Sequence, residues 1–310
     1  SYAASTRHAD TLMLFTGSVT DFGNGDSSGG MKLDLPSMTW TNMLTSITPG
    51  RRYATAVTYK DTVVMFGGHD GNNALRDVWK MSVTDETWTK ATTSGAIVPG
   101  LYRHSAVVYK DDMVVFGGDL GATGSNDVWK FDLAGSNQWS KITTGGSAKP
   151  CPADSVWRCG CGESYWCTES ECTGGNCGYK APGACGPGCH AGTSCACTIN
   201  GIPYTKPSMR YGHTAIVHDT SMIIFSGGYS TRDSEVWLFD LDANVWTKAT
   251  TSGTVPAPRN YARAVVFEEK MVMYGGILQT SYGDLWTLDL DSYKWEKLES
   301  SSSSETMLAR

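Results

Sequence analysis

A series of apolar runs and polar loops recurs along the chain, and it is clearest between residues 54 and 91. The run Val63-Val64-Met65-Phe66 ends at Gly67-Gly68, and a polar loop rich in Gly and Asn follows. A second run opens at Asp77-Val78-Trp79, and Trp88 lies in a third. Short apolar runs bounded by Gly, Asn and Asp predict β-strands joined by tight turns. The strands expected here cover residues 54–59, 62–66, 77–83 and 87–91, with Lys60-Asp61 as the first hairpin turn.

The series repeats with a period near 50 residues. The tryptophans of the third run are Trp40, Trp88, Trp139, Trp246 and Trp295. Their separations are 48, 51, 107 and 49 residues, so the long gap is one period plus an insertion of just under sixty residues. The first unit is degenerate, because it carries Gly17-Ser18 for the glycine pair and Met31 for the earlier tryptophan. A fixed period of this length predicts a repeat architecture, in which each unit buries its faces against its neighbours.

The glycine pair, the Asp-Val-Trp type of run and the later tryptophan, recurring together, resemble the kelch repeat. The resemblance covers the chain apart from the insertion. It implies an all-β fold: a kelch-type β-propeller, like the central propeller of galactose oxidase, with five four-stranded blades. The long gap in the period places a cysteine-rich insertion, expected to be disulfide-rich, between blades 3 and 4. Residues 1–150 would form blades 1–3, residues 151–207 the insertion, and residues 208–310 blades 4 and 5. Kelch rings are more often six- or seven-bladed, so a blade supplied by the insertion or by another segment is the alternative.

The repeated glycines and tryptophans have expected structural roles. A glycine pair at the end of the second strand permits positive φ and close approach of neighbouring chains. Two large rings per blade are suited to filling the space between twisted sheets, so we expect the tryptophans to form the core between blades. The alternative is that they are platforms for a ligand. Because the period places them in every blade, we favour packing.

A column of aromatic and arginine residues opens each unit. In kelch-like propellers this position lies where the chain passes from an outer strand to the innermost strand of the next blade, at the mouth of the central channel. The residues expected at this binding rim are Tyr2, Arg52, Tyr53, Tyr102, Arg103, Tyr211 and Tyr261. Tyrosine and arginine are enriched in binding surfaces. The alternative is that these side chains cap the channel and pair with neighbouring carboxylates.

The insertion holds every cysteine of the chain. They are Cys151, Cys159, Cys161, Cys167, Cys172, Cys177, Cys185, Cys189, Cys195 and Cys197. The segment has few aliphatic residues, so it needs covalent or metal cross-links to fold. An even and dense set of cysteines favours five disulfides and an extracellular, secreted or lumenal protein. Zinc bound by thiolates, with His190 nearby, is the alternative, although paired Cys-x2-Cys knuckles are missing.

Charge and composition exclude two classes of partner. The net charge is −6 and Lys and Arg form no cluster, so a nucleic-acid partner is not expected. No 18-residue apolar run occurs in the sequence, so no membrane span is expected.

Candidate chemistry is sparse in the repeats. A copper oxidase of the galactose oxidase type would need a Tyr–Cys crosslink, and the repeats contain no cysteine. His104 and His213 follow the rim column at a position that is structural in the kelch family. We therefore assign no catalytic, cofactor or metal residue and expect a non-enzymatic extracellular binding or structural module. Its partner would be a protein, including other copies of itself, or a glycan stacked on the tyrosines. The alternative is a secreted kelch-fold enzyme acting on a carbohydrate in the channel.

Overall fold

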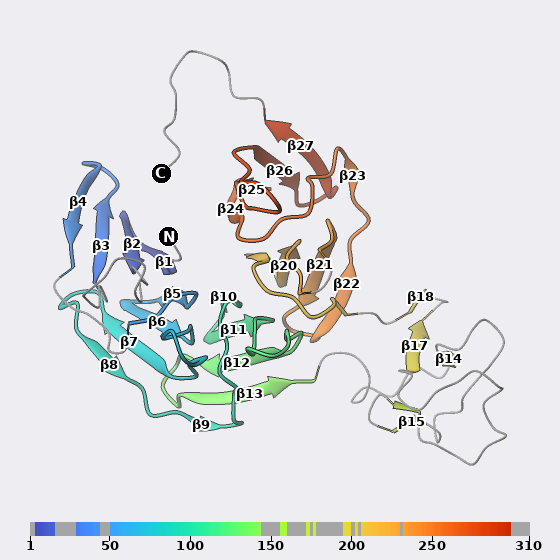
Figure 1. The fold of residues 1–310 in the computed structure, drawn as a ribbon, viewed down its shortest axis with the longest axis horizontal. Coiled ribbons are helices and arrows are strands. Elements are labelled where there is room, and N and C mark those ends of the chain that lie inside the picture. Colours follow the sequence, from blue (N-terminus) through green and yellow to red (C-terminus); the bar gives the residue numbers. More distant parts are fainter. Residues whose placement is uncertain are drawn as a thin grey trace.

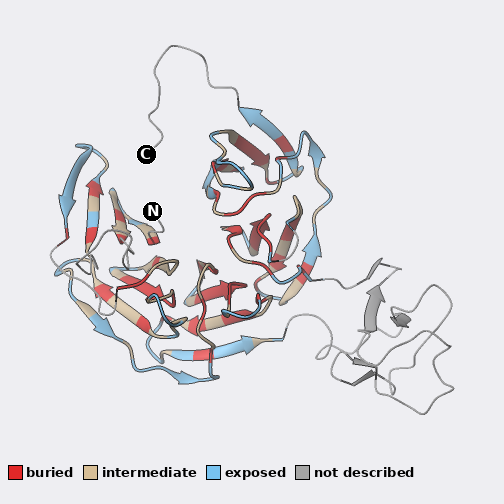
Figure 2. Ribbon diagram, viewed as in Figure 1, coloured by how far each residue is buried: buried red, intermediate tan, exposed pale blue. Residues whose placement is uncertain are grey.

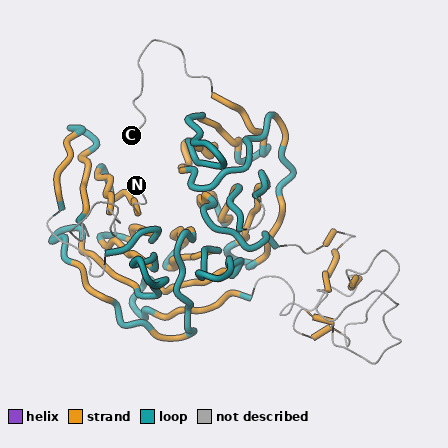
Figure 3. The backbone as a smooth tube through the Cα atoms, in the orientation of Figure 1, coloured by secondary structure: helices purple, strands orange, loops and turns teal. Residues whose placement is uncertain are grey.

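The protein is a propeller built from β-strands. The computed structural model describes residues 4–15, 29–43, 50–143, 206–229 and 232–298, and the backbone of five short strands between residues 156 and 203. Within these residues no helix occurs (Figure 3). Five sheets, each with a core of four antiparallel strands, follow one another around an arc (Figure 1). The predicted all-β kelch-type propeller with five four-stranded blades is confirmed.

The strand order in each blade is the order along the chain. Blade 1 contains β1 (Ala4–His8), β2 (Thr11–Phe15), β3 (Gly30–Asp34) and β4 (Thr39–Asn42). Blade 2 contains β5 (Thr55–Tyr59), β6 (Thr62–Phe66), β7 (Val78–Ser82) and β8 (Trp88–Lys90). Blade 3 contains β10 (Ser105–Tyr109), β11 (Asp112–Phe116), β12 (Val128–Asp132) and β13 (Gln138–Ile142). Blade 4 contains β19 (Thr214–His218), β20 (Ser221–Phe225), β21 (Val236–Asp240) and β22 (Val245–Lys248). Blade 5 contains β24 (Arg263–Phe267), β25 (Lys270–Tyr274), β26 (Leu285–Asp289) and β27 (Lys294–Leu298).

Two connections between blades add a short edge strand that the sequence did not predict. After blade 2, β9 (Ser94–Gly95) pairs in parallel with β13 of the next blade, and β23 (Ser252–Gly253) does the same with β27. Gly95 has a φ of 83°, and a Cβ there would lie 2.3 Å from the carbonyl oxygen of Trp139. Only glycine fits such an approach. Each edge strand therefore ties the outgoing chain to the outer strand of the following blade.

Apolar side chains fill the space between consecutive blades. Figure 2 shows the buried residues in red along the strands of the blades. An outer-strand tryptophan of one blade packs on the phenylalanine that ends the second strand of the preceding blade. The ring pairs are Trp88 on Phe15, Trp139 on Phe66, Trp246 on Phe116 and Trp295 on Phe225. Their centroids are 4.7–5.3 Å apart, within the range of favourable aromatic contacts. The packing role predicted for these four tryptophans agrees with the structure.

Trp40 differs from the other outer-strand tryptophans. Its side chain, on β4, is exposed, whereas Trp139, Trp246 and Trp295 are buried. The prediction that every repeated tryptophan lies in the core is wrong for Trp40. The physical reason is that blade 1 is the first of the arc, so the structure places no preceding blade against this face (Figure 1).

The glycine that ends the second strand is required by close packing. Gly67 has a φ of 67°, and a Cβ there would lie 2.4 Å from the carbonyl oxygen of Leu101 in the next blade. In blade 4 the same position is Ser226, with a φ of 58°. The Ser226 hydroxyl donates to the Asp233 carbonyl oxygen at 2.8 Å and accepts the Arg259 N–H at 2.8 Å. These bonds offset the unfavourable backbone conformation.

The chain leaves the propeller between blades 3 and 4, where the insertion was predicted. β13 ends at Ile142 and β19 begins at Thr214. Between them, β14 (Val156–Cys159), β17 (Cys195–Ile199) and β18 (Ile202–Pro203) form one small sheet, and β15 (Cys172–Thr173) pairs with β16 (Asn176–Cys177). The ten cysteine side chains lie outside the described residues, so the disulfides stay a prediction.

Candidate binding surface at the channel mouth

Blades 2 to 5 are each entered through three consecutive residues with different roles, and in blades 2, 4 and 5 the first is a buried clamp. The guanidinium of Arg210 donates to the Ser226 carbonyl oxygen at 2.9 Å and to both carboxylate oxygens of Asp233 at 2.9 and 3.2 Å. The equivalent groups are Arg51 with Gly67 and Asp77, and Arg259 with Gly275 and Asp284. These bidentate bonds join the end of the second strand to the start of the third. The first position is thus structural, and it is the buried Leu101 in blade 3.

The electrostatics of the clamp confirm a strong pairing. Burial alone would raise the pKa of Asp77, but the bonds and charge of Arg51 outweigh it and leave that pKa lowered. The same balance, with Arg259 as the partner, lowers the pKa of Asp284. Both carboxylates are therefore ionised at neutral pH and neutralise the buried cations.

The second residue binds the loop that follows the glycine pair. The backbone of Arg52 exchanges two hydrogen bonds with that of His69, at 3.0 and 2.9 Å. Tyr102 does the same with Asp119, at 3.3 and 2.8 Å. The loop residue is therefore held beside the mouth. Sequence reasoning missed Asp119; the signal that could have found it is its position directly after Gly117-Gly118.

The third residue forms a ring of backbone hydrogen bonds around the mouth, the mouth ring. Its members are Tyr53, Arg103, Gly212 and Tyr261, with φ between 59° and 66°. The N–H groups of Arg103, Gly212 and Tyr261 each donate to the carbonyl oxygen of the preceding member, at 3.0, 3.0 and 2.6 Å. The left-handed conformation costs about 1 kcal/mol for a residue other than glycine, and the bonds offset it. By the same register blade 1 would contribute Tyr2, which lies outside the described residues.

The mouth ring gathers the predicted rim side chains around one cation. The Cζ of Arg103 lies 4.4 Å from the ring centroid of Tyr53 and 5.1 Å from those of Tyr102 and Tyr211. The ring of Tyr261, from blade 5, stacks on Tyr53 at 6.3 Å with an interplanar angle of 28°. Cation–π contacts of this geometry are favourable. Five of the seven predicted rim residues therefore meet in one cluster.

Arg52 lies at the edge of this cluster, and Asp119 pairs with its central cation. The Arg52 Cζ is 5.7 Å from the Tyr53 ring, and the Arg103 guanidinium pairs with the Asp119 carboxylate at 3.2 Å. This ion pair matches the alternative reading, in which rim residues pair with carboxylates. The Nε atoms of both Arg52 and Arg103 are buried and have no hydrogen-bond partner. Both atoms are covered by protein, so any contact with an outside molecule would use the other guanidinium nitrogens.

Local surroundings set the protonation of the cluster. Burial lowers the pKa of Arg103, but the hydroxyl of Tyr53 and the neighbouring Tyr261 outweigh it, so that pKa is raised and the cation is retained. Burial, and then the bond to Asp119, raise the pKa of Tyr102, so its hydroxyl stays protonated. Burial and the charge of Arg52 lower the pKa of His69, which is neutral at pH 7.

Two buried histidines, each next to the mouth ring in sequence, link adjacent blades by hydrogen bonds. The Nε2 atom of His104 is hydrogen-bonded to the Thr55 hydroxyl of the preceding blade, and that of His213 to the Ser105 hydroxyl, both at 2.7 Å. Burial lowers the pKa of each imidazole to about 3. Their predicted structural role is confirmed, because they join adjacent blades as neutral groups.

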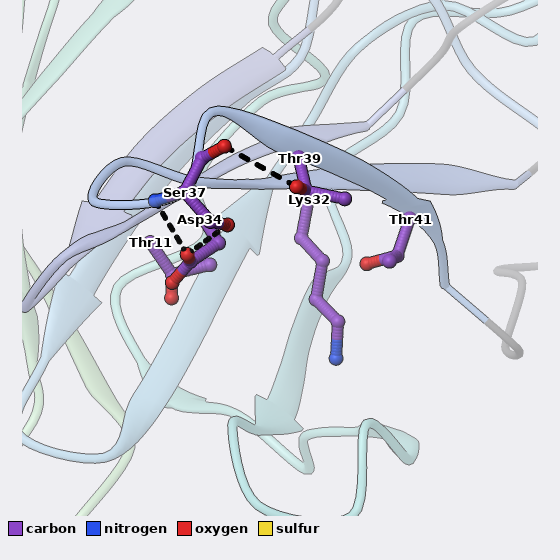
Figure 4. Close-up of a pocket in the computed structure, with 6 residues that line it drawn as sticks. All are labelled: Thr11, Lys32, Asp34, Ser37, Thr39 and Thr41. Carbon is purple, nitrogen blue, oxygen red and sulfur yellow. Dashed lines mark hydrogen bonds between the residues drawn. The ribbon is translucent and has the colours of Figure 1, made fainter.

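A separate pocket lies on blade 1, and Asp34, Ser37 and Thr39 are hydrogen-bonded to one another in it (Figure 4). Its volume is about 440 Å³, and the residues that line it are Thr11, Lys32, Asp34, Ser37, Thr39 and Thr41. Asp34 accepts hydrogen bonds from the backbone N–H and the hydroxyl of Ser37, and these bonds lower its pKa. Lys32 forms an ion pair with Glu86 of blade 2. We therefore take the channel mouth, not this pocket, as the candidate site.

Metal-binding clusters and membrane-spanning helices are both absent from the described part of the chain. No group of three or more His, Cys, Asp and Glu side chains in the described ranges is placed to hold a metal ion. Those ranges also contain no helix with the length and apolar character needed to cross a membrane.

The repeated blades, their glycine pairs and the tryptophans between them define a kelch-type repeat propeller. A family model described as the KLHDC2/KLHL20/DRC7 Kelch-repeats domain matches residues 2–171 and 193–309. The chain therefore belongs to this Kelch-repeat family, whose fold typically serves protein–protein interaction.

Three curated proteins are similar to part of the chain. Host cell factor 2 of Homo sapiens is 38% identical over 68 residues, which are 19% of this chain and 9% of that protein. The Rho GTPase-activating protein gacHH of Dictyostelium discoideum is 35% identical over 68 residues, 18% of this chain and 4% of that protein. The leucine-zipper-like transcriptional regulator 1 homolog of Drosophila melanogaster is 34% identical over 76 residues, 22% of this chain and 8% of that protein. Each similarity spans less than a tenth of the relative's length.

Proposed function

We propose that this chain is a non-enzymatic module that binds a protein partner through the channel mouth. The observation that carries the proposal is the cluster of four tyrosines around Arg103, held in place by the mouth ring. Aromatic and arginine side chains on a rigid backbone lose little conformational freedom on binding. The Kelch-repeat family supports a protein as the partner.

The charges at the mouth indicate what the partner presents. Arg52 and Arg103 bring two guanidinium groups, and Asp119 neutralises one of them. Guanidinium groups pair well with carboxylate or carbonyl oxygens. The partner segment we propose carries an acidic or carbonyl-rich turn next to an apolar side chain that packs on the tyrosines.

The test compares capture of proteins from the native source by the immobilised chain and by its variants. We expect Tyr53→Ala with Tyr261→Ala to abolish capture of the specific partner. The matched control is Tyr109→Ala, which removes a tyrosine that bonds Asp242 at the β10–β11 turn, at the opposite end of β10 from the mouth. Equal capture by all variants would refute the rim as the contact surface, provided that thermal unfolding shows each variant folded.

Glycan binding is the second candidate, because the rim tyrosines are half-buried and tyrosine rings can stack on the apolar faces of sugars. A glycan array probed with the chain and with the same variants separates the two. Glycan binding that depends on Tyr53 and Tyr261 would replace the protein partner with a carbohydrate. Turnover of a bound carbohydrate would instead favour the enzyme alternative.

We also propose that the protein acts outside the cell or in a lumenal compartment, with its insertion closed by five disulfides. The support is the concentration of ten cysteines in one short segment. Alkylation of the native protein under denaturing conditions, followed by mass spectrometry, tests this. We expect no labelled cysteine before reduction and ten after it. Ten labelled cysteines after metal chelation alone would refute the disulfides and favour zinc.

A further inference from the structure

The first and last blades of the arc each have an apolar face that no other blade covers. Val57, Val107 and Ile216 occupy the same position on the first strands of blades 2, 3 and 4, and are 6–8% exposed because the next blade covers them. Val265 occupies this position on β24 and is 61% exposed. Phe267, two residues further along, is 65% exposed. The last blade therefore ends in a sheet face of the type that is buried elsewhere.

The aromatic pair that closes every other interface is split between the two ends of the arc. Phe116 and Phe225, which receive a tryptophan, are at most 1% exposed, whereas the equivalent Tyr274 of blade 5 is 55% exposed. Trp40 of blade 1 is 43% exposed, against 2% for Trp139. Blade 5 thus presents a receiving ring without a tryptophan, and blade 1 a tryptophan without a receiving ring. The two faces are opposite halves of an interface that the structure shows four times.

Direct contact between blades 5 and 1 is not the arrangement that the packed interfaces favour. The first strands pack in series, β1 on β5, β5 on β10, β10 on β19 and β19 on β24. Among the described strands no comparable packing joins β24 to β1, and Figure 1 places their blades at the two ends of the arc. Packed cores do not deform continuously. Closing the gap would require change at interfaces that are already filled by ring pairs and joined by the mouth ring.

We propose that one further blade of the same repeat type, contributed by the polypeptide outside residues 1–310, occupies the space between blades 5 and 1. Its outer-strand tryptophan packs on Tyr274, and its second-strand aromatic residue receives Trp40. A single repeat carries both halves, so it covers both faces at once. This surface is distinct from the channel mouth, and either proposal can fail without the other.

The test measures how fast a cysteine at the exposed position reacts. In Val265→Cys, the alkylation rate of Cys at this position is followed by mass spectrometry of its peptide, and Val107→Cys is the matched control at a covered position. We expect position 265 to react at least tenfold faster than position 107 in the 310-residue chain. In a second variant, residues 299–310 are replaced by a second copy of residues 92–143, which carries the blade 2-to-3 connection and blade 3. We expect this copy to slow position 265 to the rate of position 107.

Three outcomes would overturn the proposal. Slow reaction at position 265 in the chain alone, independent of concentration, would mean that blade 5 closes on blade 1. Slow reaction that becomes fast on dilution would mean that a second copy covers the face. Fast reaction in the presence of the added repeat would mean that a blade of this type does not fit the gap.

Trp40→Ala gives an independent measurement. We expect no change in the midpoint of urea unfolding for the chain alone, and a clear decrease when the added repeat is present. An equal decrease in both would contradict the inference, because it would place Trp40 in a formed interface without the further blade.

Discussion

Lowering the pH from 7 to 5 should destabilise this propeller strongly, because His104 and His213 are buried in neutral form. Each has a pKa of about 3 in the folded chain, against 6.5 for an ordinary histidine. The unfolded chain therefore binds more protons between pH 6.5 and 3. The stability that the neutral form confers is complete above pH 6.5 and is lost as the pH falls.

The magnitude follows from the size of the pKa difference. Each histidine lowers the free energy of unfolding by about 1.4 kcal/mol per pH unit below its unfolded pKa. Between pH 7 and pH 5 the loss is about 2 kcal/mol for each and about 4 kcal/mol for both. For a domain of this size, that is a decrease in Tm of about 10 °C. His69, whose pKa burial also lowers, adds a contribution of the same sign.

The assay is urea unfolding at a series of pH values, followed by tryptophan fluorescence. Gln can retain a hydrogen bond to Thr55 or Ser105 but does not titrate. We therefore compare the slope of unfolding free energy against pH, rather than absolute stability, in His104→Gln, His213→Gln and the double variant. Each single variant should lose a similar part of the slope, and the double variant most of it. An unchanged slope in the double variant would refute the reasoning.

Three further predictions concern interactions that hold the blades together, and urea unfolding checks each. Arg259→Ala should lower the free energy of unfolding by about 3 kcal/mol or more, because it leaves the Asp284 carboxylate without its buried partner. Lys248→Ala, which breaks the exposed pair with Glu235, should lower it by about 1 kcal/mol or less, and similar losses in the two variants would show that the clamp adds little. Gly67→Ala should lower the free energy of unfolding by well over 1 kcal/mol, because its Cβ would lie 2.4 Å from the Leu101 carbonyl oxygen. Gly121 has a φ of 95° and open space around it, so Gly121→Ala should show only the backbone cost of about 1 kcal/mol, and equal losses would mean that the contact at Gly67 relaxes freely. Trp139→Ala should cost about 3–5 kcal/mol, since it removes a buried ring between blades 2 and 3, and a loss below 1 kcal/mol would contradict the role assigned to the tryptophans.

The blades could be predicted from the sequence because their signals are local and repeated. The strands expected at residues 62–66 and 77–83 are observed at Thr62–Phe66 and Val78–Ser82. Polar turns such as Lys60-Asp61 were also readable, since a short hairpin needs a residue that tolerates positive φ, and Lys60 has a φ of 52°. Period and turn chemistry were sufficient for the architecture.

The details that could not be predicted depend on contacts between distant segments. The two-residue strand β9 exists only because β13 of the next blade offers its edge. The substitution of Ser226 for glycine depends on bonds to Asp233 and Arg259 that no local pattern reveals. The exposure of Trp40 depends on which blade precedes it, and the repeat period treats all blades alike.

The candidate site could be predicted in part, because its residues also recur with the period of the repeat. The column of Arg and Tyr residues was visible as a repeat, but the column contains three roles that differ by one residue along the chain. Arg51 and Arg52 are adjacent in sequence, yet one is clamped to Asp77 and the other lies beside Tyr53. Their different positions follow from the direction of the backbone at the mouth, which the sequence does not show.

The contacts across the junction between blades 3 and 4 determine whether the two halves of the propeller need a continuous chain to stay together. Several hydrogen bonds cross it, among them Gly212 N–H to the Arg103 carbonyl oxygen, Asn126 Nδ2 to that of Pro207, and the Tyr229 hydroxyl to that of Ala122. An apolar cluster around Phe116 and Trp246 joins the same two blades. A molecule cleaved within the insertion should thus remain a two-piece complex, and this locus is a natural place to divide the gene for fragment complementation.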